Sequence, residues 1–175
     1  MTWVISWEEE EEKKITCLIR LQINYTALYL GIMGAGGCFA GANPGYTVRE
    51  LSHHVKVTGT KFLLIDVKVL DVATAAAKEC GIPLSNIVVL NFHGEVTPDG
   101  YRSWHSLLDK GEKDWVQIKD QDTTAAYFST SGTTGFPKAA IISHGYLVSQ
   151  AISLEQVCAT QNSKENVSSH DYNRD

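Results

Sequence analysis

The sequence predicts an α/β fold in which a parallel or mixed sheet is flanked by helices. Two apolar runs carry this prediction, residues 61–66 (KFLLID) and 86–91 (NIVVLN). Neither run alternates between apolar and polar positions, which is typical of strands buried on both faces of a parallel sheet. Between them, residues 69–80 have apolar side chains at helical spacing, and Gly81 follows at a position suited to a helix end. Strand, helix and strand together predict a right-handed βαβ unit.

The first 23 residues predict no part of this sheet. Glutamates occupy positions 8–12, where like charges repel one another. Lys13 and Lys14 follow Glu9 and Glu10 at a spacing of four residues, which gives a helix some support. We therefore expect a solvated helix or tail over residues 1–23.

Residues 21–48 carry no charged side chain, so a membrane span has to be weighed. Several glycines between positions 31 and 41, followed by Asn43 and Pro44, argue against a continuous span. A helix around residues 25–33 and a short buried strand over residues 38–42 explain the pattern better. A membrane-anchored interaction protein stays open as an alternative.

Thr47 and Glu50 have the spacing of a capping box, which predicts the start of a helix. This helix carries Leu51 and Val55 and stops near Gly59. His53 and His54 are sequence neighbours on it and therefore point in different directions. We expect both histidines at the surface.

The second half of the chain predicts fewer elements. Residues 98–100 (PDG) mark a turn, residues 104–108 a short helix and residues 146–157 a longer one. Residues 162–175 have almost nothing to bury, which predicts a disordered tail. We divide the chain into an atypical N-terminal segment (1–23), a globular part (24–150) and a polar C-terminal tail (151–175).

The composition of the chain argues against several classes of function. The glutamates at positions 8–12 account for the whole net charge of −5, so nothing favours a nucleic-acid partner. The start lacks the basic and apolar regions of a signal peptide. Scattered cysteines indicate reduced thiols in a cytosol-like compartment. A zinc site could combine two cysteines with two histidines, but their spacing matches no known zinc-ligand pattern. These residues are Cys80, His93, His105 and Cys158.

Residues 125–142 carry the candidate chemistry. Two apolar runs, 125–128 and 139–142, enclose a stretch of small, hydroxyl-bearing and glycine residues, which predicts strand, tight loop and strand. Glycines let backbone N–H groups approach a ligand, and successive N–H groups form an anion site. A plain hairpin is the alternative for such a composition. We predict a polyphosphate site formed by Ser129, Thr130, Ser131, Gly132, Thr133, Thr134, Gly135, Pro137 and Lys138.

The order STSGTTGFPK over residues 129–138 differs from a Walker loop, in which the lysine precedes Ser or Thr. It resembles the phosphate loop of the adenylate-forming superfamily: acyl- and aryl-CoA synthetases, 4-coumarate–CoA ligases, luciferases and peptide-synthetase adenylation domains. Residues 34–37 (GAGG), residues 41–51 and the pair Ser143–His144 are similar to the same family's N-terminal domain, in the same order. The resemblance covers residues 24–150.

The resemblance implies an AMP-binding ligase that uses ATP and Mg²⁺ to join a carboxylic acid to AMP and then passes the acyl group to coenzyme A. It implies that the loop over residues 129–138 holds the β- and γ-phosphates. For His144, a helix-start role and a catalytic role both stay open. The family acts in the cytoplasm and in some cases in peroxisomes, and no peroxisomal tripeptide ends this sequence.

The family's adenine site, metal-binding acid and catalytic lysine have no counterpart in residues 1–175. We therefore expect an incomplete part of the large N-terminal domain of an adenylate-forming enzyme, inactive alone, with exposed apolar surface near its C-terminal end. A non-catalytic phosphate-binding or regulatory remnant is the further alternative. Nucleotide and carboxylic acid are the expected ligands, and no membrane span is expected.

Overall fold

The computed structural model describes residues 14–18, 23–108, 114–130 and 138–171. Within them, seven strands form one sheet in the order β5-β4-β3-β1-β2-β6-β7. The strands are β1 (Lys14–Leu18), β2 (Cys38–Gly41), β3 (Phe62–Asp66), β4 (Ile87–Leu90), β5 (Arg102–Ser103), β6 (Thr124–Thr130) and β7 (Lys138–Ser143). The helices are α1 (Ile23–Gly34), α2 (Val48–Thr58), α3 (Leu70–Cys80) and α4 (His144–Asp171), with short 3₁₀ turns at Val67–Val69, Leu84–Asn86 and Trp104–Leu107.

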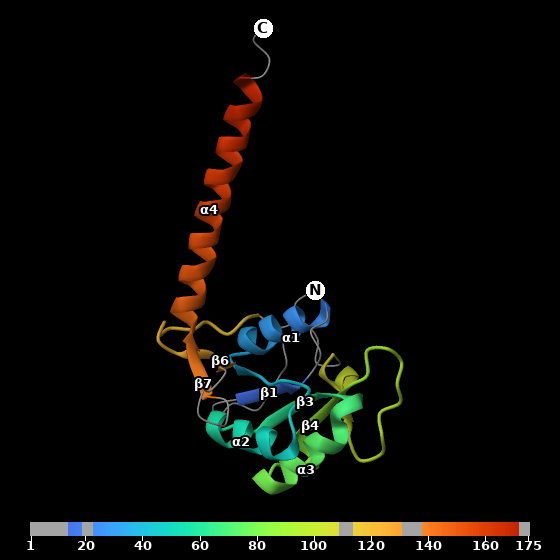
Figure 1. Cartoon of the computed structure of the whole chain (residues 1–175). Coiled ribbons are helices and arrows are strands. Elements are labelled where there is room, and N and C mark those ends of the chain that lie inside the picture. Colours follow the sequence, from blue (N-terminus) through green and yellow to red (C-terminus); the bar gives the residue numbers. More distant parts are fainter. Residues whose placement is uncertain (1–13, 19–22, 109–113, 131–137, 172–175) are drawn as a thin grey trace.

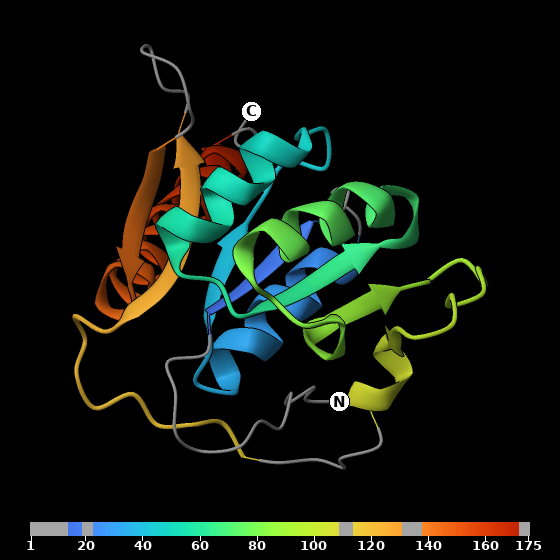
Figure 2. The same cartoon turned by 90° about the horizontal axis from the view of Figure 1, so that it is seen from below.

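The sheet is parallel from β5 to β6, and β7 alone pairs antiparallel among the described strands. Helix α1 covers one face, and α2 and α3 cover the other (Figure 1). Figure 2 views the sheet from the side of α2 and α3. The predicted α/β class and the β3–α3–β4 unit are confirmed.

Two apolar clusters hold these three layers together. One lies between α1 and the sheet and includes Ile32, Phe39 and Val88. The other lies between the sheet and α2 and α3, and includes Leu51 and Ile65. Neighbouring residues of one strand enter opposite clusters, which is why the central strands are apolar without alternation.

The prediction for residues 1–23 is wrong over β1. Residues Lys14–Leu18 form a strand in the interior of the sheet, hydrogen-bonded in parallel to β2 on one side and to β3 on the other. Ile15, Cys17 and Leu18 are fully buried. Their apolar run is too short for a periodic signal and follows a row of charges, so the local pattern did not reveal it. Residues 1–13 lie outside the described part.

The predictions for α1, β2 and α2 are confirmed. At the start of α2, the Thr47 N–H donates to the Glu50 carboxylate at 2.8 Å, and the Glu50 N–H donates to Thr47 Oγ1 at 3.4 Å. This is the capping box that the spacing predicts. The helix ends at Gly59, whose φ of 67° is left-handed. Within the described part of the chain, none of the helices combines the length and apolar character needed to cross a bilayer.

The surface prediction is wrong for His54, which is 5% exposed, whereas His53 is half-buried. Three structures enclose α2: the sheet, α3 and the turn that precedes the helix. Ser52 Oγ of α2 donates to Glu79 Oε2 of α3 at 2.7 Å. On another side, the His54 ring lies 6.2 Å from the ring of Tyr46, centroid to centroid. A helix packed on several sides has less exposed surface than its own sequence suggests.

Helix α4 departs from the expected tail. We predicted a helix over residues 146–157 and disorder from residue 162, whereas the structure continues α4 to Asp171. The helix extends away from the sheet and the other helices (Figure 1). Its side chains over residues 148–160 are exposed.

Candidate functional site

The hairpin β6–β7 carries the candidate phosphate loop. Ser129 and Thr130 are the last residues of β6, and Lys138 is the first residue of β7. Thr130 pairs with Lys138 across the hairpin, and Thr130 Oγ1 donates to the Lys138 carbonyl at 3.3 Å. The two predicted strands on either side of the loop are therefore confirmed. The remaining predicted site residues lie outside the described part: Ser131, Gly132, Thr133, Thr134, Gly135 and Pro137.

Strand β6 ends, and β7 begins, at the edge of the sheet where the parallel strands end. Strand β6 runs parallel to β2, and Gly41 at the end of β2 lies opposite Phe128. Ser129 Oγ donates to the Gly41 carbonyl at 3.5 Å. The side chains of Ser129, Thr130 and Lys138 are exposed, although both hydroxyls donate to backbone carbonyls in this conformation. Ligands of open α/β sheets bind at this carboxyl edge.

The family-like segment after Gly41 forms a tight turn next to the loop. Asn43 Oδ1 accepts a hydrogen bond from the Gly45 N–H at 2.9 Å, and the Asn43 carbonyl accepts one from the Tyr46 N–H at 3.0 Å. Thr47 then caps α2. These residues thus connect β2 to α2 in a fixed conformation along the carboxyl edge.

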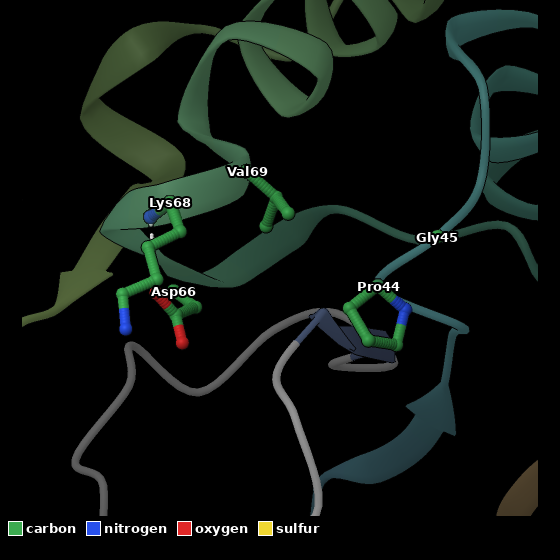
Figure 3. A pocket seen from close by; sticks show the side chains of 5 residues that line it. All are labelled: Pro44, Gly45, Asp66, Lys68 and Val69. Carbon is green, nitrogen blue, oxygen red and sulfur yellow. Dashed lines mark hydrogen bonds between the residues drawn. The ribbon is translucent and has the colours of Figure 1, made fainter.

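A pocket of about 170 Å³ lies at the same edge, between the turn after β2 and the turn after β3. Pro44, Gly45, Asp66, Lys68 and Val69 line it (Figure 3). Asp66 is 8% exposed, and its Oδ1 accepts a hydrogen bond from the Lys68 N–H at 3.0 Å. The pocket is smaller than the roughly 300–1,000 Å³ of complete small-molecule sites, so it has room for only part of a ligand.

This pocket is not among the sites that the sequence predicts. Its signal is the position of Asp66 and Lys68 directly after the apolar run of β3. Charged residues that follow a buried parallel strand lie at the carboxyl edge, where ligands bind.

Ser143 and His144 lie at the opposite edge of the sheet. Ser143 pairs with Thr124, the first residue of β6, whereas Lys138 pairs with Thr130, the last. The length of β7 therefore separates them from the loop, about 17 Å at the usual rise per residue. Ser143 Oγ accepts the Tyr146 N–H at 3.2 Å, as a residue at a helix start does. His144 is half-buried, and burial lowers its pKa.

No metal centre is visible in the described part. Among those residues, no three His, Cys, Asp or Glu side chains lie together as a metal site requires. None of the four cysteines forms a disulfide bond.

Several known proteins resemble this chain in sequence and fold. The model of the AMP-binding enzyme family matches residues 10–172. The acyl-CoA synthetase ACTT5 of Alternaria alternata is 44% identical over 126 residues, which is 70% of this chain and 22% of the relative. The acyl-CoA ligase azaF of Aspergillus niger is 38% identical over 134 residues, 73% of this chain and 25% of the relative.

A solved structure extends the match to three dimensions. ATP-bound MatB from Rhodopseudomonas palustris superposes with a TM-score of 0.65 at 26% identity, covering 83% of this chain and 27% of that one. This chain thus spans about a quarter of the length of the relatives named here. The family match includes β1, which the sequence analysis assigned to an unrelated segment. This chain belongs to the family of AMP-binding enzymes.

Proposed function

We propose that this chain contributes the polyphosphate-binding part of an ATP-dependent ligase that joins a carboxylic acid to coenzyme A. The observation that carries the proposal is the geometry of the β6–β7 hairpin. Thr130 of β6 and Lys138 of β7 pair with each other at the carboxyl edge of the sheet, so the two stems of the proposed loop lie together at this edge. The acyl-CoA synthetase and ligase relatives support the reaction class.

The proposed reaction has two steps. A carboxylate oxygen of the acid attacks the α-phosphorus of ATP, the bond from that phosphorus to the β-phosphate oxygen breaks, and pyrophosphate leaves. The thiol of coenzyme A then attacks the acyl carbon, and AMP leaves. Negative charge grows on the departing pyrophosphate in the first step, and donors held in place stabilise such charge.

The chain's own contribution lies in that first step. The Lys138 ammonium supplies a full positive charge at one stem of the loop, and the hydroxyls of Ser129 and Thr130 lie at the other stem. Glycines and hydroxyl residues between the stems add backbone and side-chain donors. Mg²⁺ enters the proposal through family resemblance alone, and we assign it to none of the described residues. Four cysteines without a disulfide bond are consistent with action in a reducing compartment such as the cytoplasm.

Replacing Lys138 tests the assignment of the loop. We expect Lys138→Ala to weaken the binding of pyrophosphate and of ATP by about 1–3 kcal/mol, because a charge-assisted contact is lost. Isothermal titration calorimetry on the purified chain measures this. Lys78→Ala is the matched control, because this exposed lysine lies near the end of α3, toward the opposite edge of the sheet. Equal effects of the two substitutions would remove the loop from its proposed role.

Turnover is a separate prediction. The proposed loop accounts for only one end of ATP, and each missing positioned donor costs about 2–4 kcal/mol in a transition state. We therefore expect no pyrophosphate release by this chain alone with ATP, coenzyme A and a mixture of fatty and aromatic acids. Rapid release would contradict the prediction. A further test places this segment in a complete relative. If that protein binds pyrophosphate tightly but has no ligase activity, the result would favour a non-catalytic phosphate-binding role.

A further inference from the structure

The imidazole of His54 is enclosed, although one of its nitrogens has nothing to bond. The side chain is 5% exposed, and Nε2 has no hydrogen-bond partner among the described residues. The ring lies 6.2 Å from the ring of Tyr46, centroid to centroid, with an angle of 51° between the two planes. Buried polar atoms normally have a partner, so an atom without one calls for an explanation.

Protonation changes what this site requires. A neutral imidazole has one N–H donor and one acceptor nitrogen, whereas an imidazolium has two N–H donors and a full charge. Burying a charge without a hydrogen-bond acceptor is strongly disfavoured. Burial, together with the charge of His53, lowers the pKa of His54 to about 4. The side chain can take up a proton at a higher pH only if part of the structure moves and lets water reach it.

The groups around the imidazole do not compensate such a charge. Among the described residues, His53 is the one whose charge acts on His54, and it opposes protonation. The other titratable side chains belong to the turn before α2, to α2 itself, and to the sheet strands and α3 that pack against it. They are Tyr46, Glu50, Lys14, Tyr127, Lys138, Glu79 and Cys80.

The turn over residues 43–47 is the part of this enclosure that can open most easily. Its backbone is held by two hydrogen bonds to Asn43, from the Gly45 N–H at 2.9 Å and from the Tyr46 N–H at 3.0 Å, and Asn43 and Gly45 are exposed. The backbone of His54, in contrast, lies within α2, and its carbonyl accepts the Thr58 hydroxyl at 2.8 Å. Exposed turns open at a lower free energy than buried helices and strands.

The same turn forms one side of the pocket at the carboxyl edge. Pro44 and Gly45 lie on that side, and Asp66 and Lys68 lie on the other (Figure 3). A movement that takes Tyr46 away from His54 also moves Pro44 and Gly45, because they directly precede Tyr46 in the chain. The position of Tyr46 and the shape of the pocket are therefore coupled.

We propose that His54 and Tyr46 form an acid-sensitive latch for the turn over residues 43–47. At neutral pH the uncharged imidazole stays covered, and the turn keeps the pocket closed on one side. In acid, a proton from solvent adds to an imidazole nitrogen, Tyr46 moves aside, and the imidazolium reaches water while the sheet stays folded. The shape of the pocket then depends on pH, whichever ligand the pocket takes.

Hydrogen exchange of the full chain, followed amide by amide, tests the latch. The pKa of His54 is about 4 when the turn is closed and about 6.5 when it is open, so falling pH favours the open turn between these values. We expect the opening equilibrium at the Gly45 and Tyr46 amides, corrected for the intrinsic exchange rate, to rise about twentyfold from pH 7 to pH 5. Low urea concentrations should leave this exchange unchanged, whereas they should speed the exchange of β3 amides, which requires global unfolding.

Three variants separate the latch from other titrating groups. His54→Phe keeps a ring beside Tyr46 but takes up no proton, so the turn should open equally at pH 7 and pH 5. The matched control His53→Gln removes the neighbouring histidine of the same helix and should keep at least half of the response. Tyr46→Ala removes the cover, and an NMR titration should then give His54 a pKa near its ordinary value of 6.5 instead of about 4.

Folding of each variant is checked by its unfolding midpoint at pH 7, and His54→Leu replaces His54→Phe if the larger ring prevents folding. Three results would each overturn the latch. The first is exchange of the Gly45 and Tyr46 amides only together with the β3 amides. The second is a pH response that persists without the His54 imidazole. The third is a His54 that still titrates near pH 4 in Tyr46→Ala.

Discussion

The imidazole of His54 is the most perturbed titrating group of the described helices. It is 5% exposed, and its Nε2 has no hydrogen-bond partner in the described part of the chain. Burial, and secondarily the charge of His53, lower the pKa of His54 to about 4. The folded protein therefore holds this side chain neutral at pH values where a free histidine takes up a proton.

Stability should consequently fall as the solution becomes acidic. The pKa of His54 is about 6.5 in the unfolded chain and about 4 in the folded chain, so the unfolded state binds more protons between these pH values. We expect a loss of about 3 kcal/mol in the free energy of unfolding between pH 7 and pH 4 from this group. Urea unfolding at a series of pH values measures it.

Two variants separate His54 from the other groups that titrate in this range. His54→Leu should flatten the pH dependence, whereas His93→Gln, at an exposed histidine, should preserve it. An unchanged slope in His54→Leu would show that another group is responsible.

At the scale of elements, the glycines at the end of α1 allow close packing. Residues 114–123 cross the end of α1, and the Val116 N–H donates to the Gly34 carbonyl at 2.8 Å. A Cβ on Gly34 would lie 3.1 Å from the Trp115 ring, and one on Gly36 would lie 3.2 Å from Val116 Cγ1. Residues 34–37 (GAGG) therefore leave room for residues 114–123, the connector that leads to β6.

Two glycines with nearly equal φ angles allow the energetic cost of crowding by Val116 to be separated from the cost of backbone strain. Gly36 has φ +74° and Gly81 has φ +72°, but nothing lies within 4 Å of a Cβ on Gly81. We expect Gly81→Ala to cost about 1 kcal/mol for the left-handed conformation. Gly36→Ala should cost more, because Val116 must also move. Urea unfolding gives both values, and Val116→Ala in the Gly36→Ala background should remove the difference. If Gly36→Ala and Gly81→Ala have equal costs, Val116 does not restrict the space at Gly36.

At the scale of the whole molecule, β1 joins the two halves of the sheet. Ile15 lies opposite Phe39 of β2 and opposite Phe62 of β3. The strand lies between α1 on one face and α2 and α3 on the other, and Cys17 within it is fully buried. Burial raises the pKa of the Cys17 thiol well above its usual range, which keeps the thiol protonated and unreactive.

Thiol labelling tests this position of β1. In the folded chain, Cys158 is exposed and should react with an aromatic disulfide reagent within minutes, whereas Cys17 and Cys38 are buried and should react only on global unfolding. Cys158→Ser should remove the fast phase and leave the slow ones, as peptide mapping of the labelled sites would establish. Fast labelling of Cys17 under native conditions would contradict the interior position of β1.

The sequence by itself determined the elements whose signals are local. Caps and turns depend on residues a few positions apart, which is why Thr47 with Glu50, Gly59 and Gly81 predict the ends of α2 and α3 correctly. The order of residues 129–138 indicated the family, and the apolar runs beside it predicted the hairpin. The identity of the loop's ligand stays a prediction.

Tertiary structure alone decided what depends on pairing between distant segments. The short run ITCL after a row of glutamates becomes an interior strand only because β2 and β3 hydrogen-bond to it. His54 is buried by neighbours outside its own helix, and the hairpin register separates His144 from the loop. Asp66 and Lys68 form a pocket with Pro44 because two strand ends meet at one edge. Burial and register are properties of such long-range contacts, and the period of a single segment does not encode them.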